Sequence, residues 1–163
     1  MHPVIKLVTI LLSNRSFMEI RKKWSSLTLY TDPKEIEGTL NLSESETGFN
    51  LKRCYKECNV DDLSYLRKQL LGELNKGVER DKSCITIVGH PDGVCVVKVR
   101  VGTKTSGKRG GWRVYVLLFN TDNADYGIVV GVTMHANGDD NITPKQRDLL
   151  KRLVDSVEKE LEK

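Results

Sequence analysis

Four short segments rich in valine and other β-branched or aromatic residues follow one another between residues 84 and 134. The first two are separated by Pro91-Asp92-Gly93, a sequence typical of a tight reversal between antiparallel strands. The later segments are also separated by stretches rich in glycine or polar residues. This pattern most constrains the fold, because it predicts successive antiparallel strands. We expect them at residues 84–88, 94–101, 112–119 and 126–134.

An amphipathic helix is predicted on each side of these strands. The first has leucines at spacings of three and four residues, with Asn59 or Asp61 as its expected cap and Gly77 after its end. The second begins at Thr143-Pro144-Lys145-Gln146, a capping box with proline at the first helical position. We therefore expect an α+β domain in which a small antiparallel sheet is flanked by helices. The helical apolar positions are Leu63, Leu66, Leu70 and Leu74, then Leu149, Leu150, Leu153, Val154, Val157 and Leu161.

The first part of the chain has a less regular pattern. The polar stretch 41–48 (NLSESETG) predicts a loop, and we place a domain boundary at its end. Residues 1–48 are thus expected to form an N-terminal extension of unclear role, and residues 49–163 the main domain. Within the extension, Val4 to Leu12 is compatible with either a strand or a short buried helix.

Composition excludes several classes of protein. A chain of 163 residues with 39% hydrophobic content can form a core, which argues against intrinsic disorder. The longest apolar run, Ile5 to Leu12, is far shorter than the ~20 residues of a membrane-spanning helix, and it lacks the features of a signal peptide. We expect a cytoplasmic protein without membrane contact. The cysteines lack the paired spacing of a metal site and are expected to be buried or unreactive thiols: Cys54, Cys58, Cys84 and Cys95.

Positive charge is concentrated in one part of the chain. Residues 93–121 contain six basic residues and no acidic one, whereas the whole chain carries +4, so the remainder carries −2. Such a local excess indicates an anionic partner, and nucleic acid is the first candidate. The alternative is an ordinary solvated surface. The six residues are Lys98, Arg100, Lys104, Lys108, Arg109 and Arg113.

Strand alternation predicts where these cations lie. Lys98 and Arg100 share one face of their strand, and Arg113 shares a face of the next strand with Tyr115. We expect Lys98, Arg100 and Arg113 to converge on an outward-facing surface beside the glycine-rich loop 102–111. This loop is not a nucleotide-binding P-loop, because Arg109 stands where that motif requires Ser or Thr.

Three segments carry a resemblance to a known family. Lys98-Val99-Arg100, the run GKRGGWRVY from Gly107 to Tyr115, and Asn141-Ile142-Thr143 before the last helix resemble the HigB-like branch of the RelE/ParE toxin superfamily. Membership would imply a toxin paired with a cognate antitoxin protein. The activity it implies is cleavage of mRNA, often on the ribosome, without a metal ion or other cofactor. Some relatives of the same fold instead poison DNA gyrase, so the fold alone does not determine the target.

The resemblance also implies roles for single residues. Arg113 would bind the scissile phosphate, and Lys98 and Arg100 would hold neighbouring phosphates, while the RNA 2′-OH serves as the nucleophile. Tyr115 is a candidate for base stacking or proton transfer. Contacts to the wider RNA backbone would come from the loop, through Lys104, Lys108 and Arg109.

Acid and base groups are the point at which the sequence departs from the family. Met134 and Ala136 occupy positions at which the family has tyrosine and lysine. His135, between them, titrates near neutrality and is the remaining candidate acid or base. The sequence therefore also fits a non-catalytic member of the fold, one that binds nucleic acid or a partner protein without cleaving RNA. A structural domain with incidental surface charge is the third possibility.

Overall fold

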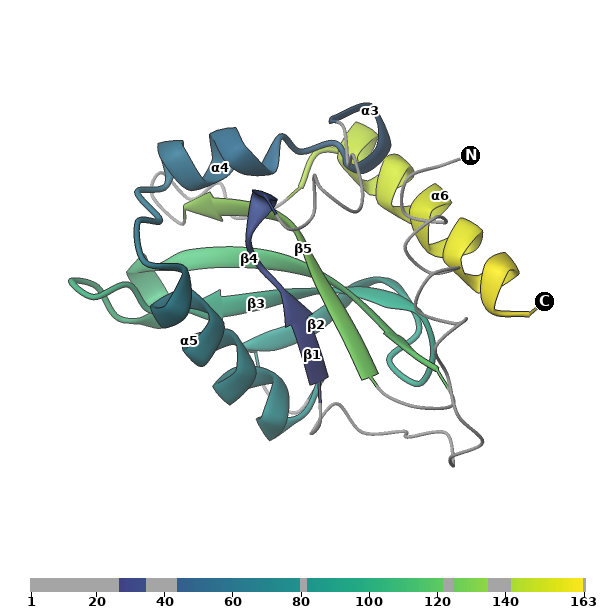
Figure 1. Ribbon diagram of the computed structural model, residues 1–163, viewed down its shortest axis with the longest axis horizontal. Helices are drawn as coiled ribbons and strands as arrows, with labels where there is room; N and C mark the ends of the chain where they lie inside the picture. The colour runs from purple at the N-terminus through teal and green to yellow at the C-terminus, as the bar shows by residue number, and fades with distance from the viewer. Residues whose placement is uncertain (1–26, 35–43, 80–81, 122–124, 135–141, 163) are drawn as a thin grey trace.

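A computed structural model describes residues 27–34, 44–79, 82–121, 125–134 and 142–162 (Figure 1). The fold is α+β, with a five-stranded sheet in the order β1-β5-β4-β3-β2. All neighbouring strands are antiparallel except β1 and β5, which are parallel. The strands are β1 (Leu27–Tyr30), β2 (Cys84–Gly89), β3 (Cys95–Val101), β4 (Trp112–Asn120) and β5 (Asp125–Met134). The helices are α3 (Glu44–Thr47), α4 (Leu51–Glu57), α5 (Leu63–Lys76), α6 (Pro144–Leu161) and the 3₁₀ turn η2 (Lys108–Gly110).

The strands and helices predicted between residues 63 and 161 are confirmed. α5 ends at Gly77, which has a positive φ of 105° that favours glycine. α6 begins with the predicted capping box, in which Thr143 and Gln146 bond to each other's backbone N–H groups. The end of α5 and the start of α6 therefore lie where local chemistry supports them.

Two local predictions near residue 60 and before residue 49 are wrong. Asp62, rather than Asn59 or Asp61, caps α5, because its carboxylate accepts a hydrogen bond from the Tyr65 N–H at 3.0 Å. Asn59 instead takes a left-handed conformation after α4, with φ of 55°. The polar stretch 41–48 is not wholly a loop, since Glu44–Thr47 forms the short helix α3.

The sheet extends across the domain boundary predicted at residue 48. β1 pairs with β5, so that Leu27 lies opposite Asp125 and Tyr30 opposite Ile128. Leu27 and Leu29 are buried in the core. Residues 27–30 thus belong to the same sheet as the strands that follow residue 49, and the boundary does not mark the edge of the sheet. The segment Val4 to Leu12 lies outside the described residues.

Helices cover both faces of the sheet. On one face, Leu66, Leu70 and Leu74 of α5 pack on the side chains that alternation assigned to the core. On the other face, α6 lies against β2 and β3, and its buried side chains share a core with residues of β4 and β5. The first face includes Cys95, Val97, Val99, Val101, Trp112, Val114, Val116 and Leu118, and the second includes Leu117, Phe119, Ile128 and Val130. Every residue of β4 except the last is buried.

Phe49, just before α4, lies close to the sheet, and this close approach depends on Gly131. A Cβ at Gly131 would lie 2.4 Å from Cγ of Phe49, so only glycine leaves room for this ring. Phe49 also stacks on Tyr115, with ring centroids 5.2 Å apart. The second face of the sheet is thereby covered beyond the reach of α6.

The cysteines are free, and three of them, Cys58, Cys84 and Cys95, are buried as expected. Burial raises the pKa of Cys95 to about 12 and that of Cys58 to about 11. Because the thiolate is the reactive form, these side chains contribute to packing rather than to chemistry at neutral pH.

Candidate nucleic-acid interface

The three cations predicted on the strands do come together. We call Lys98, Arg100 and Arg113 the strand cluster. In the β3–β4 ladder, Arg100 lies directly opposite Arg113, and Lys98 lies opposite Tyr115. Directly opposed residues of an antiparallel pair share a face, so all three cations lie on one face near the end of the sheet that carries the loop.

Arg113 does not face outward, which corrects the prediction from alternation. Its side chain is fully buried, with 0% exposure. Its Nη1 donates to the carbonyl of Lys108 at 2.8 Å and to the carbonyl of Trp112 at 3.3 Å. The physical reason is that β4 is central in a sheet covered on both faces. Arg113 therefore fastens the η2 turn to the strand.

The other members of the strand cluster differ in exposure. Lys98 is also buried, with 7% exposure, so the prediction of an outward-facing lysine is wrong. Arg100, one position from the end of β3, is partly exposed. A ligand that approaches this conformation from solvent therefore reaches Arg100 before the other two.

Tyr115 is fully buried, so its predicted role in stacking on a base does not fit this conformation. Its ring is already stacked on Phe49, and its hydroxyl lies 3.4 Å from Oγ1 of Thr133. It acts as a core side chain with a satisfied polar end. His135 and Ala136 lie outside the described residues, and Met134 ends β5.

The glycine-rich segment between β3 and β4, residues 102–111, is called the basic loop here. Its two ends meet closely, since a Cβ at Gly111 would lie 2.1 Å from the Val101 carbonyl oxygen and 3.0 Å from Cα of Gly102. Within it, Oγ1 of Thr103 accepts a hydrogen bond from the Ser106 N–H at 2.9 Å. The loop is thus a compact turn beside the start of α5 (Figure 1).

Lys104 of the basic loop is exposed, and it pairs with the cap of α5. Its Nζ lies 2.8 Å from Oδ2 of Asp62 and 5.5 Å from the centre of the Tyr65 ring. The hydrogen bond from Lys104, assisted by the Tyr65 N–H, lowers the pKa of the Asp62 carboxyl. The same bond raises the pKa of Lys104. Because both side chains are largely solvated, the pair is a weak link that an anionic ligand can replace.

Lys108 makes a second link between the basic loop and α5. Its Nζ lies 2.6 Å from Oε1 of Glu73, whose side chain is only 8% exposed and also pairs with Lys76 at 3.2 Å. Acidic residues of α5 thus compensate two of the loop cations, although these acids are distant in sequence from the basic segment. Arg109 lies in η2, and its side chain is outside the described part of the structure.

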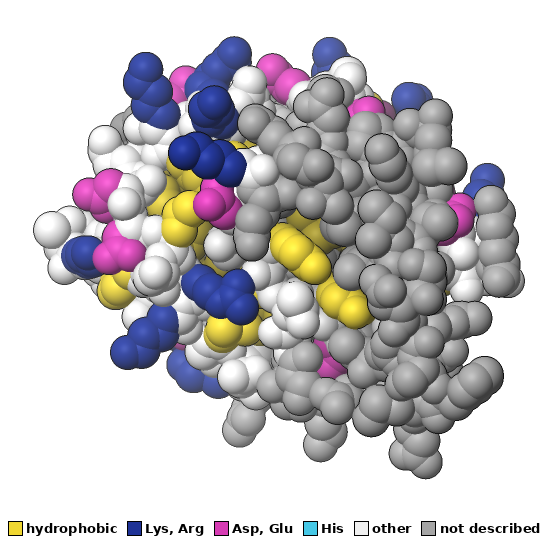
Figure 2. Space-filling model, viewed as in Figure 1, with side chains coloured by type: hydrophobic (Ala, Val, Ile, Leu, Met, Phe, Trp, Pro, Cys, Tyr) yellow, Lys and Arg dark blue, Asp and Glu magenta, His cyan; other side chains and the backbone are white. Residues whose placement is uncertain are grey.

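The molecular surface shows the same compensation. On the face seen in Figure 2, the described Lys and Arg side chains alternate with Asp and Glu and with small apolar areas. No single basic patch covers the described part of this face. Because Lys98 and Arg113 are buried and Lys104 and Lys108 pair with carboxylates, the charge summed along residues 93–121 overstates the positive surface that a ligand would meet.

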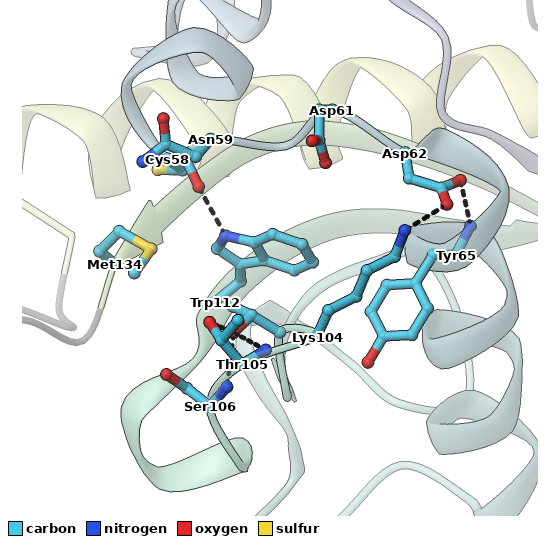
Figure 3. A pocket seen from close by; sticks show the side chains of 11 residues that line it. Cys58, Asn59, Asp61, Asp62, Tyr65, Lys104, Thr105, Ser106, Trp112 and Met134 are labelled. Atoms are coloured by element: carbon cyan, nitrogen blue, oxygen red, sulfur yellow. Dashed lines mark hydrogen bonds and ion pairs between the residues drawn. The ribbon is translucent and has the colours of Figure 1, made fainter.

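A pocket of about 320 Å³ opens between the basic loop and the connection from α4 to α5 (Figure 3). The indole of Trp112 and the ring of Tyr65 are among its walls, with centroids 6.4 Å apart and planes at 71°. Sequence reasoning assigned Trp112 to the core, which its 5% exposure confirms, but did not expect it to border a pocket and gave Tyr65 no role. The available signal was an aromatic residue one turn into α5, together with a tryptophan that directly follows the loop.

Comparisons with protein-family models, with curated proteins and with solved structures gave no significant match. The described helices include none with the length and apolar character needed to cross a membrane. Nor do the described residues contain a group of three or more His, Cys, Asp or Glu side chains placed to hold a metal ion.

Proposed function

We propose that this protein is a toxin-like endoribonuclease of the HigB-like branch of the RelE/ParE superfamily, which cleaves RNA without a metal ion. The observation that supports it best is the β3–β4 register, in which Arg100 faces Arg113 and Lys98 is their neighbour on the same face. Three cations on adjacent strands, next to a glycine-rich loop with further cations, match the residues that carry the family resemblance.

RNA supplies its own nucleophile, so few protein groups are required. The 2′-OH attacks the adjacent phosphorus, the bond to the 5′ oxygen breaks, and the products are a 2′,3′-cyclic phosphate and a 5′-OH. The protein must stabilise the negative charge that develops on the phosphate and move one proton in each direction. In this proposal arginine and lysine provide the charge, and His135 provides acid or base chemistry.

The exposure of each cation refines its proposed role. Arg100 is partly exposed, so we assign to it the first contact with the scissile phosphate. Arg113 adds positive potential behind Arg100 and holds the η2 turn through the Lys108 carbonyl. Lys98 has a similar supporting position. Lys104 and Lys108 exchange their carboxylate partners on α5 for phosphates of the RNA backbone.

A cleavage assay with purified protein tests this proposal. End-labelled RNA is incubated in EDTA with the wild type, Arg100→Ala, His135→Ala and the control Arg152→Ala, whose side chain is exposed on α6. We expect cleavage by the wild type and by the control. The cleavage rate is expected to fall at least about 100-fold in Arg100→Ala and in His135→Ala. A cleavage rate in Arg100→Ala equal to that of the wild type would remove the strand cluster from the mechanism. Cleavage that occurs without EDTA and is abolished when EDTA is present would exclude the metal-independent reaction.

Growth of a bacterial host provides the test in the cell. Induced wild-type protein is expected to arrest growth and to create new mRNA 5′ ends, and co-expression of a cognate antitoxin is expected to relieve both effects. Arg100→Ala is expected to produce neither effect. Normal growth with intact mRNA, at equal levels of folded protein, would contradict the toxin proposal.

A second candidate function is non-catalytic binding of nucleic acid or of a partner protein. The burial of Arg113 favours it, and so do Met134 and Ala136 at positions where the family has tyrosine and lysine. This candidate predicts RNA binding that weakens steeply with added salt, while the bound RNA stays intact. Binding and cleavage measured on the same labelled RNA separate the two functions.

A further inference from the structure

The pocket beside Trp112 lies on the other face of the sheet from the strand cluster. Trp112 and Arg113 are consecutive in β4, so their side chains point to opposite faces. The two aromatic walls are fixed in place. The Trp112 Nε1–H donates to the Cys58 carbonyl at 2.8 Å, and the Tyr65 hydroxyl donates to the Gly102 carbonyl at 3.3 Å. Rigid aromatic walls in a pocket of about 320 Å³ suit a flat ring system.

The polar groups of the pocket define which ring system fits. Asp61 and Asp62 reach it from the α4–α5 connection, and in Figure 3 the Lys104 side chain lies between the Trp112 indole and the Tyr65 ring. Both carboxylate oxygens of Asp62 already accept hydrogen bonds, one from the Tyr65 N–H and one from Lys104. Asp61 is exposed, points toward the space above the indole, and forms no ion pair with any residue that the structure describes. Of the two carboxylates, the one whose oxygens remain for a ligand is therefore that of Asp61.

We propose that this pocket binds the guanine base of an unpaired nucleotide. Two carboxylates against one lysine disfavour a phosphate inside the pocket, whereas an ionised carboxylate needs hydrogen-bond donors. Guanine presents two adjacent donors, N1–H and N2–H, on its Watson–Crick edge. Adenine, cytosine and uracil each place an acceptor beside their donor on that edge, and it would face the carboxylate. Asp61 accepts from guanine, and the base lies against the Trp112 side of the pocket.

The direction of the remaining nucleotide follows from Lys104. This residue lies at the side of the pocket and belongs to the basic loop, so the sugar and phosphate extend from the pocket toward the loop cations. That the base comes from an RNA strand rests on the proposed function. Binding of the base itself is independent of cleavage and is tested without RNA.

Tryptophan fluorescence tests the proposal directly, because Trp112 lines the pocket. The chain has two tryptophans, so Trp24→Phe leaves Trp112 as the only tryptophan whose fluorescence is followed. Guanosine is titrated into this variant, with adenosine as a competitor of the same purine size and cytidine and uridine as smaller pyrimidine competitors. We expect saturable quenching by guanosine and at least tenfold weaker binding of the other three. Asp61→Asn is expected to weaken guanosine binding by about tenfold or more.

Controls keep a failure of this proposal distinct from a failure of the proposed function. Asp92→Asn removes an exposed carboxylate in the β2–β3 turn and is expected to bind guanosine as the parent does. Arg100→Ala is expected to lose RNA cleavage and to keep guanosine binding. Calorimetric titration of the unmodified chain repeats the comparison without the Trp24 change. Absence of saturable guanosine binding, equal affinity for all four nucleosides, or unchanged affinity in Asp61→Asn would each overturn the guanine site.

Discussion

Lys104 and Arg113 belong to the same basic segment of sequence, yet the fold places them in opposite environments. Lys104 has a side chain that is 57% exposed and pairs with a largely solvated aspartate. Arg113 is fully buried and bonds to backbone carbonyls. The basic loop and the strand cluster therefore have different relations to an anionic ligand. The loop can exchange partners at the surface, whereas the strand cluster chiefly shapes the loop and the local potential.

The largest expected effect is that of Arg113→Ala on stability. The substitution leaves the Lys108 and Trp112 carbonyls without this donor and creates space in a closed core. We expect a loss of about 2–4 kcal/mol in the free energy of unfolding, measured by urea denaturation. Arg152→Ala, on the exposed face of α6, is the control and is expected to change it by less than about 0.5 kcal/mol.

The same measurement tests whether the Arg113 side chain is buried in solution. If the unfolding midpoint of Arg113→Ala equals that of the wild type, the side chain is accessible in solution, as strand alternation alone predicted. The strand cluster would then be accessible to RNA without a change in the protein's conformation. A strongly destabilised variant also explains why loss of activity in Arg113→Ala is poor support for catalysis, and why Arg100→Ala is the better probe.

The second-largest effect on stability is expected where the two ends of the basic loop meet. A Cβ at Gly111 would lie 2.1 Å from the Val101 carbonyl oxygen, so the backbone must shift to admit alanine. Gly111→Ala is expected to cost about 1–3 kcal/mol in denaturant unfolding. Gly107→Ala is a matched control in the same loop, because Gly107 has nothing within 4 Å of its added Cβ and a φ of −72°. Equal effects of the two changes would mean that the close joint does not persist in solution.

Much of the fold between residues 63 and 161 follows from periodicity. Leucines at helical spacing and a complete capping box have local causes that one sequence displays. β1 was missed because a strand of four residues, Leu27–Tyr30, carries little pattern of its own. Its place beside β5 depends on contacts almost a hundred residues away. Neither expected cap of α5, Asn59 or Asp61, is the one used, because several polar side chains within four residues could serve and the sequence does not distinguish them from Asp62.

The burial of Arg113 had a sequence signal that alternation alone did not use. On the face of β4 that carries Arg113, the next residues are Tyr115, Leu117 and Phe119, all apolar or aromatic. A strand that is apolar on both faces is typical of a sheet covered on both sides. The loop's acidic partners left no comparable trace, because Asp62 and Glu73 lie on a helix that only the tertiary fold brings near. The same holds for the pocket between Trp112 and Tyr65.

A smaller effect is expected where the loop meets α5. Lys108→Ala removes one of the two lysines paired with Glu73, whose side chain is nearly buried, and leaves Lys76 in place. We expect a loss of about 1 kcal/mol in the free energy of unfolding. In a Glu73→Gln background the same change should cost less, since the charge pair is already gone. An additive result in this double-mutant cycle would show that the Lys108–Glu73 pair contributes nothing in solution.

The smallest effect on stability is expected for Lys104→Ala, because the Lys104 side chain is exposed. The pKa of Asp62 is lowered in the folded protein, first by the hydrogen bond from Lys104 and then by the Tyr65 N–H. The link therefore stabilises the fold at pH values above the ordinary carboxyl pKa, and it is lost as pH falls through the lowered one. In Lys104→Ala, an NMR titration should show the Asp62 pKa rising toward its ordinary value, with no measurable change in the neutral-pH unfolding midpoint. An unchanged Asp62 pKa would mean that the lysine is already released from the carboxylate. Lys104 of the basic loop would then be available to a phosphate before any ligand binds.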